Sequence, residues 1–174
     1  MYWYLPWAWT NSFLEALVRA DPVVATPLTD GDLDAAAELH SAAFDHPWSG
    51  EELASLLGQS GSFGFVARRV GHPDEPPLGF VLVRNTKGEV EILTIAVAPR
   101  ARRHGVGRLL MDHVLQHLHA ERAESLFLEV DEENAGARHL YERLRFVEVG
   151  RRPAYYKQPD GRRTSALTLK RSLR

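Results

Sequence analysis

The 174-residue sequence contains no cysteine, and this absence excludes disulfide bonds, thiolate-ligated zinc and a covalent acyl-cysteine intermediate. No apolar run approaches the roughly 20 residues that a membrane-spanning helix needs. Positive charge is not in excess either, because 21 lysines and arginines stand against 23 aspartates and glutamates, giving a net charge of -2. Nucleic-acid-binding proteins are usually basic. We therefore expect a cytoplasmic protein with no nucleic-acid, membrane or metal partner.

What is present is typical of one globular domain. Hydrophobic residues make up 44% of the chain and charged residues 25%, enough of each for a core and a solvated surface. We assign residues 23–174 to a single domain and residues 1–22 to an N-terminal extension. The extension begins MYWYLPWAWT, an uncharged aromatic cluster, and Ser12 with Glu15 predicts a short capped helix behind it. The aromatic cluster either packs back on the domain or forms a contact surface, such as that of a homodimer.

Hydrophobic periodicity predicts an α+β fold with a mixed sheet. Helical spacing runs from Leu33 to Phe44, and the pairs Thr29–Asp32 and Ser49–Glu52 have the spacing of helix N-terminal caps. Other helices are expected over 105–122 and 134–144, and strands over 65–69, 78–84, 90–97, 125–130, 146–151 and 164–169.

The segment 89–108, EVEILTIAVAPRARRHGVGR, joins an apolar strand to a helix through a basic loop with two glycines. Glycine lets the backbone turn sharply and approach a ligand closely. The first amides of a helix have no internal partner, and the helix dipole favours an anion there. Basic residues before a helix favour an anion-binding loop over a plain surface turn. The loop is neither a Walker A motif nor a full Gly-x-Gly-x-x-Gly fingerprint, and we interpret it as a pyrophosphate-binding loop.

The pattern Arg102-x-x-Gly105-x-Gly107 resembles the acetyl-CoA pyrophosphate signature of the GCN5-related N-acetyltransferase (GNAT) superfamily. Over roughly residues 24–172 the chain is similar to the RimI-type ribosomal-protein-alanine N-acetyltransferases within it. The other matching segments are FDHPWS at 44–49, IAV at 95–97, LEV at 128–130, Asn134, LYE at 140–142 and the segment 151–161. The resemblance implies the acyl-CoA N-acyltransferase fold, with a mixed sheet of about six to seven strands and about four helices.

The resemblance implies acetyl-CoA as co-substrate. Its pyrophosphate would be bound by Arg102, Arg103, His104, Gly105, Val106, Gly107 and Arg108. The strand end formed by Ile95, Ala96 and Val97 would offer backbone groups to the pantetheine arm, where two parallel strands separate. Asn134 has the position of a helix cap, and in the family the matching asparagine also contacts the cofactor.

Two side chains are candidates for proton transfer. Glu129 lies in the apolar strand SLFLEV, where a carboxylate either acts as general base, faces solvent or makes a structural hydrogen bond. Tyr141 follows Asn134 by about two helical turns. It is either a core aromatic or an acid, since a phenol with a pKa of about 10 can protonate a thiolate. The resemblance implies that Glu129 is the general base and Tyr141 the general acid.

The implied acceptor is a protein N-terminal α-amine, the N-terminal alanine of a small-subunit ribosomal protein. Candidates for the acceptor groove are Phe44, Trp48, Glu91, Tyr155 and Tyr156. Glu91 either pairs with an incoming α-ammonium or interacts across the sheet. The same scaffold serves small amines and lysine side chains, so an N-acetyltransferase of those acceptors remains an alternative, as does a non-catalytic acyl-CoA-binding module.

Overall fold

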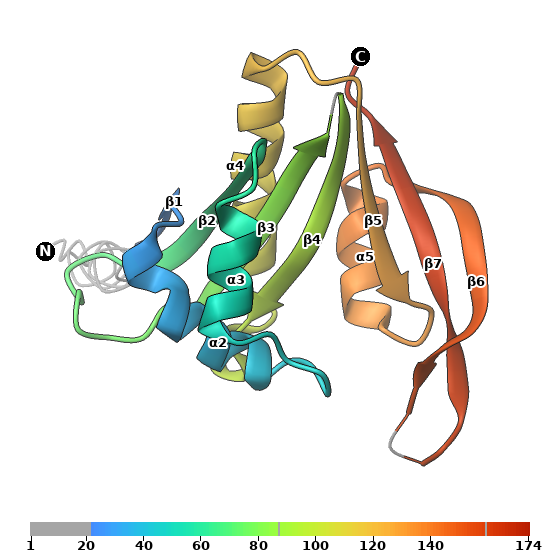
Figure 1. Cartoon of the computed structure of the whole chain (residues 1–174), viewed down its shortest axis with the longest axis horizontal. Helices are drawn as coiled ribbons and strands as arrows, with labels where there is room; N and C mark the ends of the chain where they lie inside the picture. Colours follow the sequence, from blue (N-terminus) through green and yellow to red (C-terminus); the bar gives the residue numbers. More distant parts are fainter. Residues whose placement is uncertain (1–21, 87, 159) are drawn as a thin grey trace, which may run out of the picture.

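The structure, a computed structural model, describes residues 22–86, 88–158 and 160–174. These residues form one seven-stranded mixed sheet with helices on both faces (Figure 1). The α+β architecture predicted from the periodicity and from the family resemblance is therefore confirmed. The aromatic cluster and the capped helix expected in the N-terminal extension lie outside the described residues.

The strand order across the sheet is β1-β2-β3-β4-β5-β7-β6, and all neighbours are antiparallel except β4 and β5, which are parallel. A parallel connection needs a long crossover, and helix α4 supplies it. The strands are β1 (Val23–Pro27), β2 (Ser62–Arg69), β3 (Gly79–Thr86), β4 (Glu89–Val97), β5 (Ser125–Asp131), β6 (Val147–Lys157) and β7 (Arg163–Ser172). The helices are η1 (Asp30–Asp32), α2 (Leu33–Ser41), α3 (Gly50–Leu57), η2 (Pro99–Ala101), α4 (Val106–Ala120) and α5 (Ala135–Arg143).

Both predicted caps form. The Thr29 N–H donates to Asp32 Oδ2 at 2.9 Å, at the start of η1. At the start of α3, the Glu52 N–H donates to Ser49 Oγ at 3.2 Å, and the Ser49 N–H donates to Glu52 Oε2 at 2.8 Å. These reciprocal bonds satisfy amides that have no partner inside a helix, which is why the helices begin there.

Strand β1 was not predicted from the sequence. It is a short edge strand, preceded by Pro22 and ending at Pro27, and it pairs antiparallel with β2. Proline is tolerated at edges because the missing N–H can face away from the ladder. The pairing partner, and not the local sequence, makes this segment a strand.

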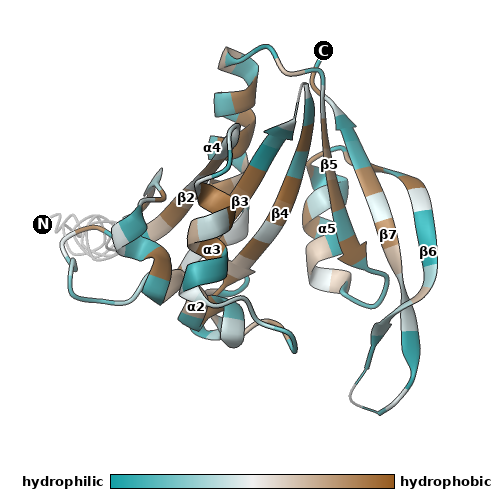
Figure 2. Ribbon diagram, viewed as in Figure 1, coloured by the Kyte–Doolittle hydropathy of each residue, from teal (hydrophilic) through white to brown (hydrophobic). Residues whose placement is uncertain are grey.

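The central strands are buried on both faces because helices cover both sides of the sheet. A Cβ built on Gly79 of β3 would lie 3.2 Å from Val106 and 3.3 Å from Leu110, so Gly79 faces α4. Its neighbour Phe80 faces the opposite side, where its ring centroid lies 6.3 Å from that of His40 in α2. In Figure 1, α2 and α3 lie in front of the sheet and α4 lies behind it. Figure 2 shows hydrophobic residues concentrated on the central strands, whereas the edge strand β6 is largely hydrophilic.

Helix α4 is fixed to the sheet by one apolar side. Its buried residues are Val106, Leu110, Met111, Val114 and Leu118, at helical spacing. Burying one such side chain contributes about 1.5–3 kcal/mol, so the start of α4 and the loop before it are held firmly against β3 and β4. Within the described ranges, no helix is both long and apolar enough to cross a membrane.

Candidate functional site

Strands β4 and β5 pair at one end only. The ladder consists of Glu89 with Ser125, Val90 with Leu126 and Glu91 with Phe127. Beyond these pairs β4 continues to Val97 and β5 to Asp131, and Figure 1 shows the two strands moving apart. The edge of β4 that faces this opening therefore carries backbone groups without a partner strand. The predicted segment Ile95 to Val97 is part of this unpaired stretch.

The loop before α4 is open to a ligand. Gly105 has φ +85, a left-handed conformation, and a Cβ built on it would meet no atom within 4 Å. Arg103 is also left-handed, with φ 64. The His104 Nδ1 lies 2.8 Å from the Arg102 carbonyl oxygen, which ties the loop to itself.

The start of α4 differs from that of its neighbours. Ser49 caps α3, and Asn134 caps α5 by accepting from the Ala137 N–H at 3.1 Å. By contrast, α4 starts after Gly105 with no side-chain cap, although it is the longest of these helices at 15 residues. Its first amides, those of Val106 and Gly107 among them, are left for an external acceptor.

The three loop arginines are not equivalent. The Arg102 Nε donates to the Val97 carbonyl at 3.2 Å, and Arg108 Nε contacts both carboxylate oxygens of Asp112 at 2.8 and 2.9 Å. Arg103 is exposed and forms no hydrogen bond or ion pair with any residue of the described chain. Uncapped amides, an unhindered Gly105 and an exposed cation fit a pyrophosphate, and the β4 edge beside them fits an extended amide-containing arm. These residues therefore suit acetyl-CoA.

The strand register separates this loop from the acceptor candidates. Glu91 pairs with Phe127, and paired residues of a parallel ladder point to the same face of the sheet. Glu129 lies two residues further along β5 and therefore points to that face as well. Glu91 also pairs with Arg84 of β3, which lies on the same face as Phe80, opposite α4. The loop thus lies with α4 on one face and Glu129 on the other, and the opening between β4 and β5 joins the two.

Tyr156 interacts electrostatically with both the predicted base, Glu129, and the predicted acid, Tyr141. The side chain of Glu129 is 25% exposed, and Arg152 Nη2 lies 3.2 Å from its Oε1. Burial and the charge of Glu129 raise the pKa of the Tyr156 phenol. Burial, with a smaller contribution from Tyr156, raises the pKa of the Tyr141 phenol well above its ordinary value. Tyr141 is therefore protonated throughout the neutral range and can only donate a proton there.

Helix α5 links Tyr141 to the loop. A Cβ built on Gly107 would lie 3.3 Å from the side chain of Leu140, the residue before Tyr141. The Tyr141 ring packs edge-on against Phe146 with centroids 5.6 Å apart, and the residue is only 4% exposed. This burial makes Tyr141 a core aromatic, the first of its two interpretations from the sequence, and its role as general acid stays a prediction.

A bulge in β6 presents the tyrosine pair. Arg152 pairs with Ala166 and Tyr156 with Thr164, so three residues of β6 stand opposite one residue of β7. Ala154 in this bulge is left-handed, with φ 53, and its carbonyl accepts from Arg163 Nη1 at 3.0 Å. The rings of Tyr155 and Tyr156 meet edge to face with centroids 5.0 Å apart.

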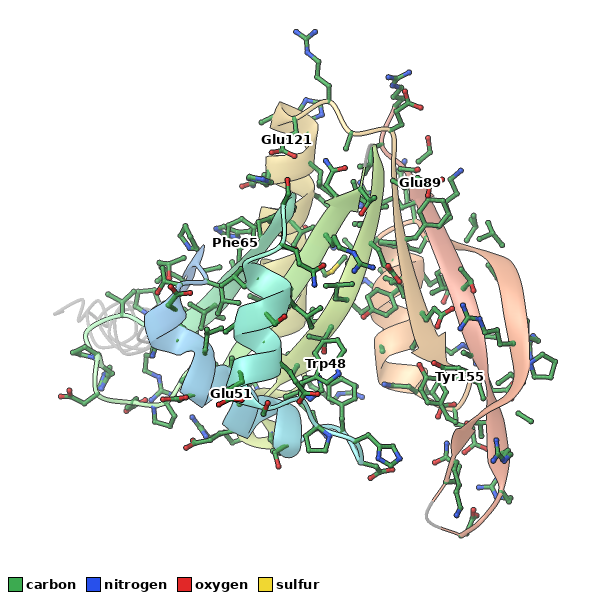
Figure 3. The ribbon with its side chains drawn as sticks, in the orientation of Figure 1. Trp48, Glu51, Phe65, Glu89, Glu121 and Tyr155 are labelled. Atoms are coloured by element: carbon green, nitrogen blue, oxygen red, sulfur yellow. The ribbon has the colours of Figure 1, made fainter. Side chains whose placement is uncertain are left out.

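The remaining acceptor candidates gather around His40. Its ring stacks on Phe44 at 4.3 Å and on Trp48 at 5.0 Å, and its Nδ1 accepts from the Trp48 backbone N–H at 3.0 Å. Burial lowers the pKa of His40, and the carboxylate of Glu52 opposes this shift. In Figure 3, Trp48 and Tyr155 lie on opposite sides of the opening between β4 and β5.

The structure thus brings Glu129, Tyr141, Tyr155 and Tyr156 together and places Phe44 and Trp48 in a separate cluster. Glu91 lies at the closed end of the opening, engaged by Arg84 at 3.4 Å. Sequence reasoning missed Arg152 and His40. Arg152 was visible only as part of a basic pair before two tyrosines, and His40 only as one polar position on an apolar helix face.

This chain is similar in sequence and in fold to known proteins. Residues 33–146 match the acetyltransferase (GNAT) family. The ribosomal protein bS18-alanine N-acetyltransferase of Escherichia coli strain K12 is 34% identical over 131 residues, which are 75% of this chain and 85% of that protein.

Solved structures that share the fold include one from Escherichia coli and one from Arabidopsis thaliana. The crystal structure of the Escherichia coli ribosomal-protein-S18-alanine N-acetyltransferase superposes with a TM-score of 0.79 at 30% identity, covering 87% of this chain and 94% of that one. Arabidopsis thaliana NAA60, solved in complex with acetyl-CoA, has a TM-score of 0.73 at 20% identity, covering 87% and 98% of the two chains. The second likeness concerns the fold alone.

Proposed function

This chain belongs to the GNAT family of acetyltransferases, and from that premise we propose that it transfers the acetyl group of acetyl-CoA to a protein N-terminal α-amine. The acceptor we propose is the N-terminal alanine of a small-subunit ribosomal protein. One observation carries the proposal: the opening between β4 and β5 joins an uncapped basic loop on one face of the sheet to Glu129 on the other.

Acetyl-CoA supplies an activated thioester, and the residues of the chain supply position and proton transfer. The first amides of α4 and the Arg103 side chain bind the pyrophosphate, and the free edge of β4 receives the pantetheine amides. This anchoring directs the thioester into the opening between the strands. Binding both reactants in one geometry accounts for a large share of the rate enhancement in such transfers.

Glu129 takes a proton from the acceptor ammonium, which leaves a neutral amine able to attack. Tyr141 supplies a proton to the departing thiolate, a role that its raised pKa permits because the phenol stays protonated at neutral pH. The amine attacks the thioester directly, and no acyl-cysteine forms because the chain contains no cysteine.

A peptide acceptor fits the surroundings of Glu129. Tyr155 is 51% exposed, and Phe44, which belongs with Trp48 to the cluster around His40, is 42% exposed. Trp48 and Tyr155 lie on opposite sides of the opening (Figure 3). Exposed aromatic side chains of this kind provide contact area for an extended chain. The sequence identity with the ribosomal-protein-alanine enzyme of Escherichia coli supports an N-terminal alanine as the acceptor.

The test is an acetyl-transfer assay followed by mass spectrometry, with three peptides of one sequence beginning Ala-Arg. One peptide has a free N-terminus, one is blocked at the N-terminus, and one is blocked and carries an added internal lysine. We expect the free peptide alone to gain one acetyl group. Modification of the blocked lysine peptide would identify a lysine acetyltransferase instead.

If no peptide is modified, a panel of small amines distinguishes the two remaining alternatives. Turnover with one of them would identify a small-molecule N-acetyltransferase. Acetyl-CoA binding without turnover on any amine would identify a binding module.

A further inference from the structure

The side of the opening that contains Glu129 already holds a cation from the protein itself. Arg152 Nη2 lies 3.2 Å from Glu129 Oε1, and its guanidinium carbon lies 5.5 Å from the centroid of the Tyr155 ring. A carboxylate and an aromatic face are the two partners that best bind an organic cation. Arg152 therefore occupies a cation-binding site whose acidic member is the proposed general base.

Arg152 is weakly held in this site. Its side chain is 60% exposed, and within the described residues Glu129 is the one carboxylate with which it forms an ion pair. Its neighbour Arg151 differs, because it pairs with Glu132 at 2.6 Å and with Glu148 at 3.2 Å. The register of β6 with β7 places these two arginines on opposite faces of the sheet.

We propose that Arg152 occupies the place of the acceptor ammonium and must leave Glu129 when the acceptor binds. The inference rests on the proposed function, because it takes Glu129 as the group that deprotonates the acceptor. An α-ammonium and a guanidinium carry the same charge and need the same partners, so the two compete for one site. The exposed side of Arg152 gives its guanidinium a path into solvent.

The exchange allows proton transfer that Arg152 itself cannot perform. The acceptor ammonium donates to Glu129; an N–H bond breaks, its electron pair stays on nitrogen, and an O–H bond forms on the carboxylate. A guanidinium does not lose its proton in proteins, so the Arg152–Glu129 pair leads to no reaction. Arg152 is a competitor of the acceptor and has no part in the chemical step.

The competition by Arg152 should weaken the binding of the acceptor and leave the binding of acetyl-CoA unchanged. Exposed ion pairs contribute up to a factor of about five to an equilibrium constant. Removing the Arg152 charge should therefore lower the KM for the acceptor by about two- to five-fold. The KM for acetyl-CoA should not change, because the loop before α4 lies on the other face of the sheet.

The variants Arg152→Gln, Arg152→Lys and Arg151→Gln test this in full-length protein with the free Ala-Arg peptide and acetyl-CoA. We expect Arg152→Gln to lower the peptide KM with kcat within about two-fold. Arg152→Lys keeps the charge and should stay near the parent value. Arg151→Gln is the matched control on the opposite face and should also leave the peptide KM unchanged. Methylguanidinium chloride should compete with the peptide more strongly in Arg152→Gln than in the parent protein.

A peptide KM that rises or stays constant in Arg152→Gln, or falls equally in Arg151→Gln, overturns the inference. Failure of the proposed function has a different signature, because no protein, parent or variant, would then acetylate the peptide. In that case the amide NMR signals of Tyr155 and Tyr156 report methylguanidinium binding directly. Tighter binding by Arg152→Gln supports the competition, and equal binding by both proteins refutes it.

Discussion

Glu129 and Tyr141 differ in how far water reaches them, and this difference separates their proposed roles. The Glu129 side chain is 25% exposed and pairs with the exposed Arg152, so solvent reaches it. Tyr141 is 4% exposed, and burial keeps its phenol protonated. A base that solvent partly reaches and a buried acid suit a reaction in which the acceptor arrives from solvent and the thioester lies inside the opening.

Replacing Glu129 with Gln should lower kcat by about 10²–10⁴-fold at neutral pH, because the amide cannot take the ammonium proton. The KM for acetyl-CoA should change little, since Glu129 and the loop before α4 lie on opposite faces. Steady-state kinetics and acetyl-CoA titration measure the two effects. Glu89→Gln is the control, at the paired end of β4, far from Trp48 and Tyr155 in Figure 3. Weakened acetyl-CoA binding in Glu129→Gln alone would mean that Glu129 is structural.

Replacing Tyr141 with Phe should lower kcat by about 10²-fold or more while leaving stability nearly unchanged. The ring and its edge-on contact with Phe146 remain, and only the hydroxyl is lost. Because the pKa of Tyr141 is raised above the ordinary phenol pKa of about 10, the phenol stays protonated up to that pH. Wild-type kcat should therefore show no loss from Tyr141 ionisation up to about pH 10. An unchanged kcat in Tyr141→Phe would exclude Tyr141 as the acid.

At the scale of elements, the loop before α4 contains two left-handed residues, Arg103 and Gly105, and Gly105 directly precedes the helix. Gly105→Ala should lower the free energy of unfolding by about 1–2 kcal/mol, because an L-residue is strained at φ +85. Gly71→Ala is a close match, since Gly71 has φ +82 and open space around it in the turn between β2 and β3. Both variants should lose similar stability in urea unfolding.

Only Gly105→Ala should also raise the KM for acetyl-CoA. The added methyl group and the shifted backbone would disturb the amides at the start of α4. Equal acetyl-CoA binding by the Gly105 and Gly71 variants would show that the loop does not hold the cofactor.

The turn between α2 and α3 is organised by a neutral histidine. The native state disfavours protonation of His40, because burial lowers its pKa below 6.5 and Nδ1 is used as an acceptor. The unfolded chain then binds the proton first. The contribution of His40 to stability is therefore complete above about pH 6.5 and is lost as pH falls towards the lowered folded-state pKa.

Urea unfolding from pH 7.5 to 5 measures this effect. His40→Asn keeps an acceptor but cannot be protonated in this range, so its stability should vary less with pH than that of the parent. His46→Asn, an exposed histidine in the same turn, is the control. An identical pH dependence in parent and His40→Asn would contradict the assignment.

At the scale of the whole molecule, the domain should not need its N-terminal extension. The buried hydrophobic cluster runs from Leu28 to Leu169 among the described residues. A chain starting at Val23 should therefore keep its thermal midpoint within a few degrees and keep acetyl-CoA turnover. A large loss of either would show that the extension, residues 1–22, is needed by the domain. Light scattering of both proteins tests the homodimer contact proposed for the aromatic cluster. If that contact forms, the full-length protein should have the mass of a dimer and the shorter chain the mass of a monomer.

Much of the fold could be predicted because its signals are local. Capping boxes, apolar periodicity and turn residues lie within a few positions of each other, and Ser49–Glu52 formed as predicted. Strand β1 escaped prediction because its stability comes from pairing with β2, about 40 residues away in sequence. The extension of β6 beyond Arg151 was also missed, because the bulge at Ala154 is held by Arg163 across the hairpin.

The sequence by itself determined the glycine-containing basic loop before α4, the helix starts and most of the strands, because each of these depends on contacts within one turn or one strand. Only the tertiary structure decided where β4 and β5 separate, that Arg152 reaches Glu129, and that His40 organises Phe44 and Trp48. These features depend on registers between distant strands and on which face each side chain occupies. A shift of one residue would send Arg152 or Glu129 to the other face, and no local signal specifies that choice.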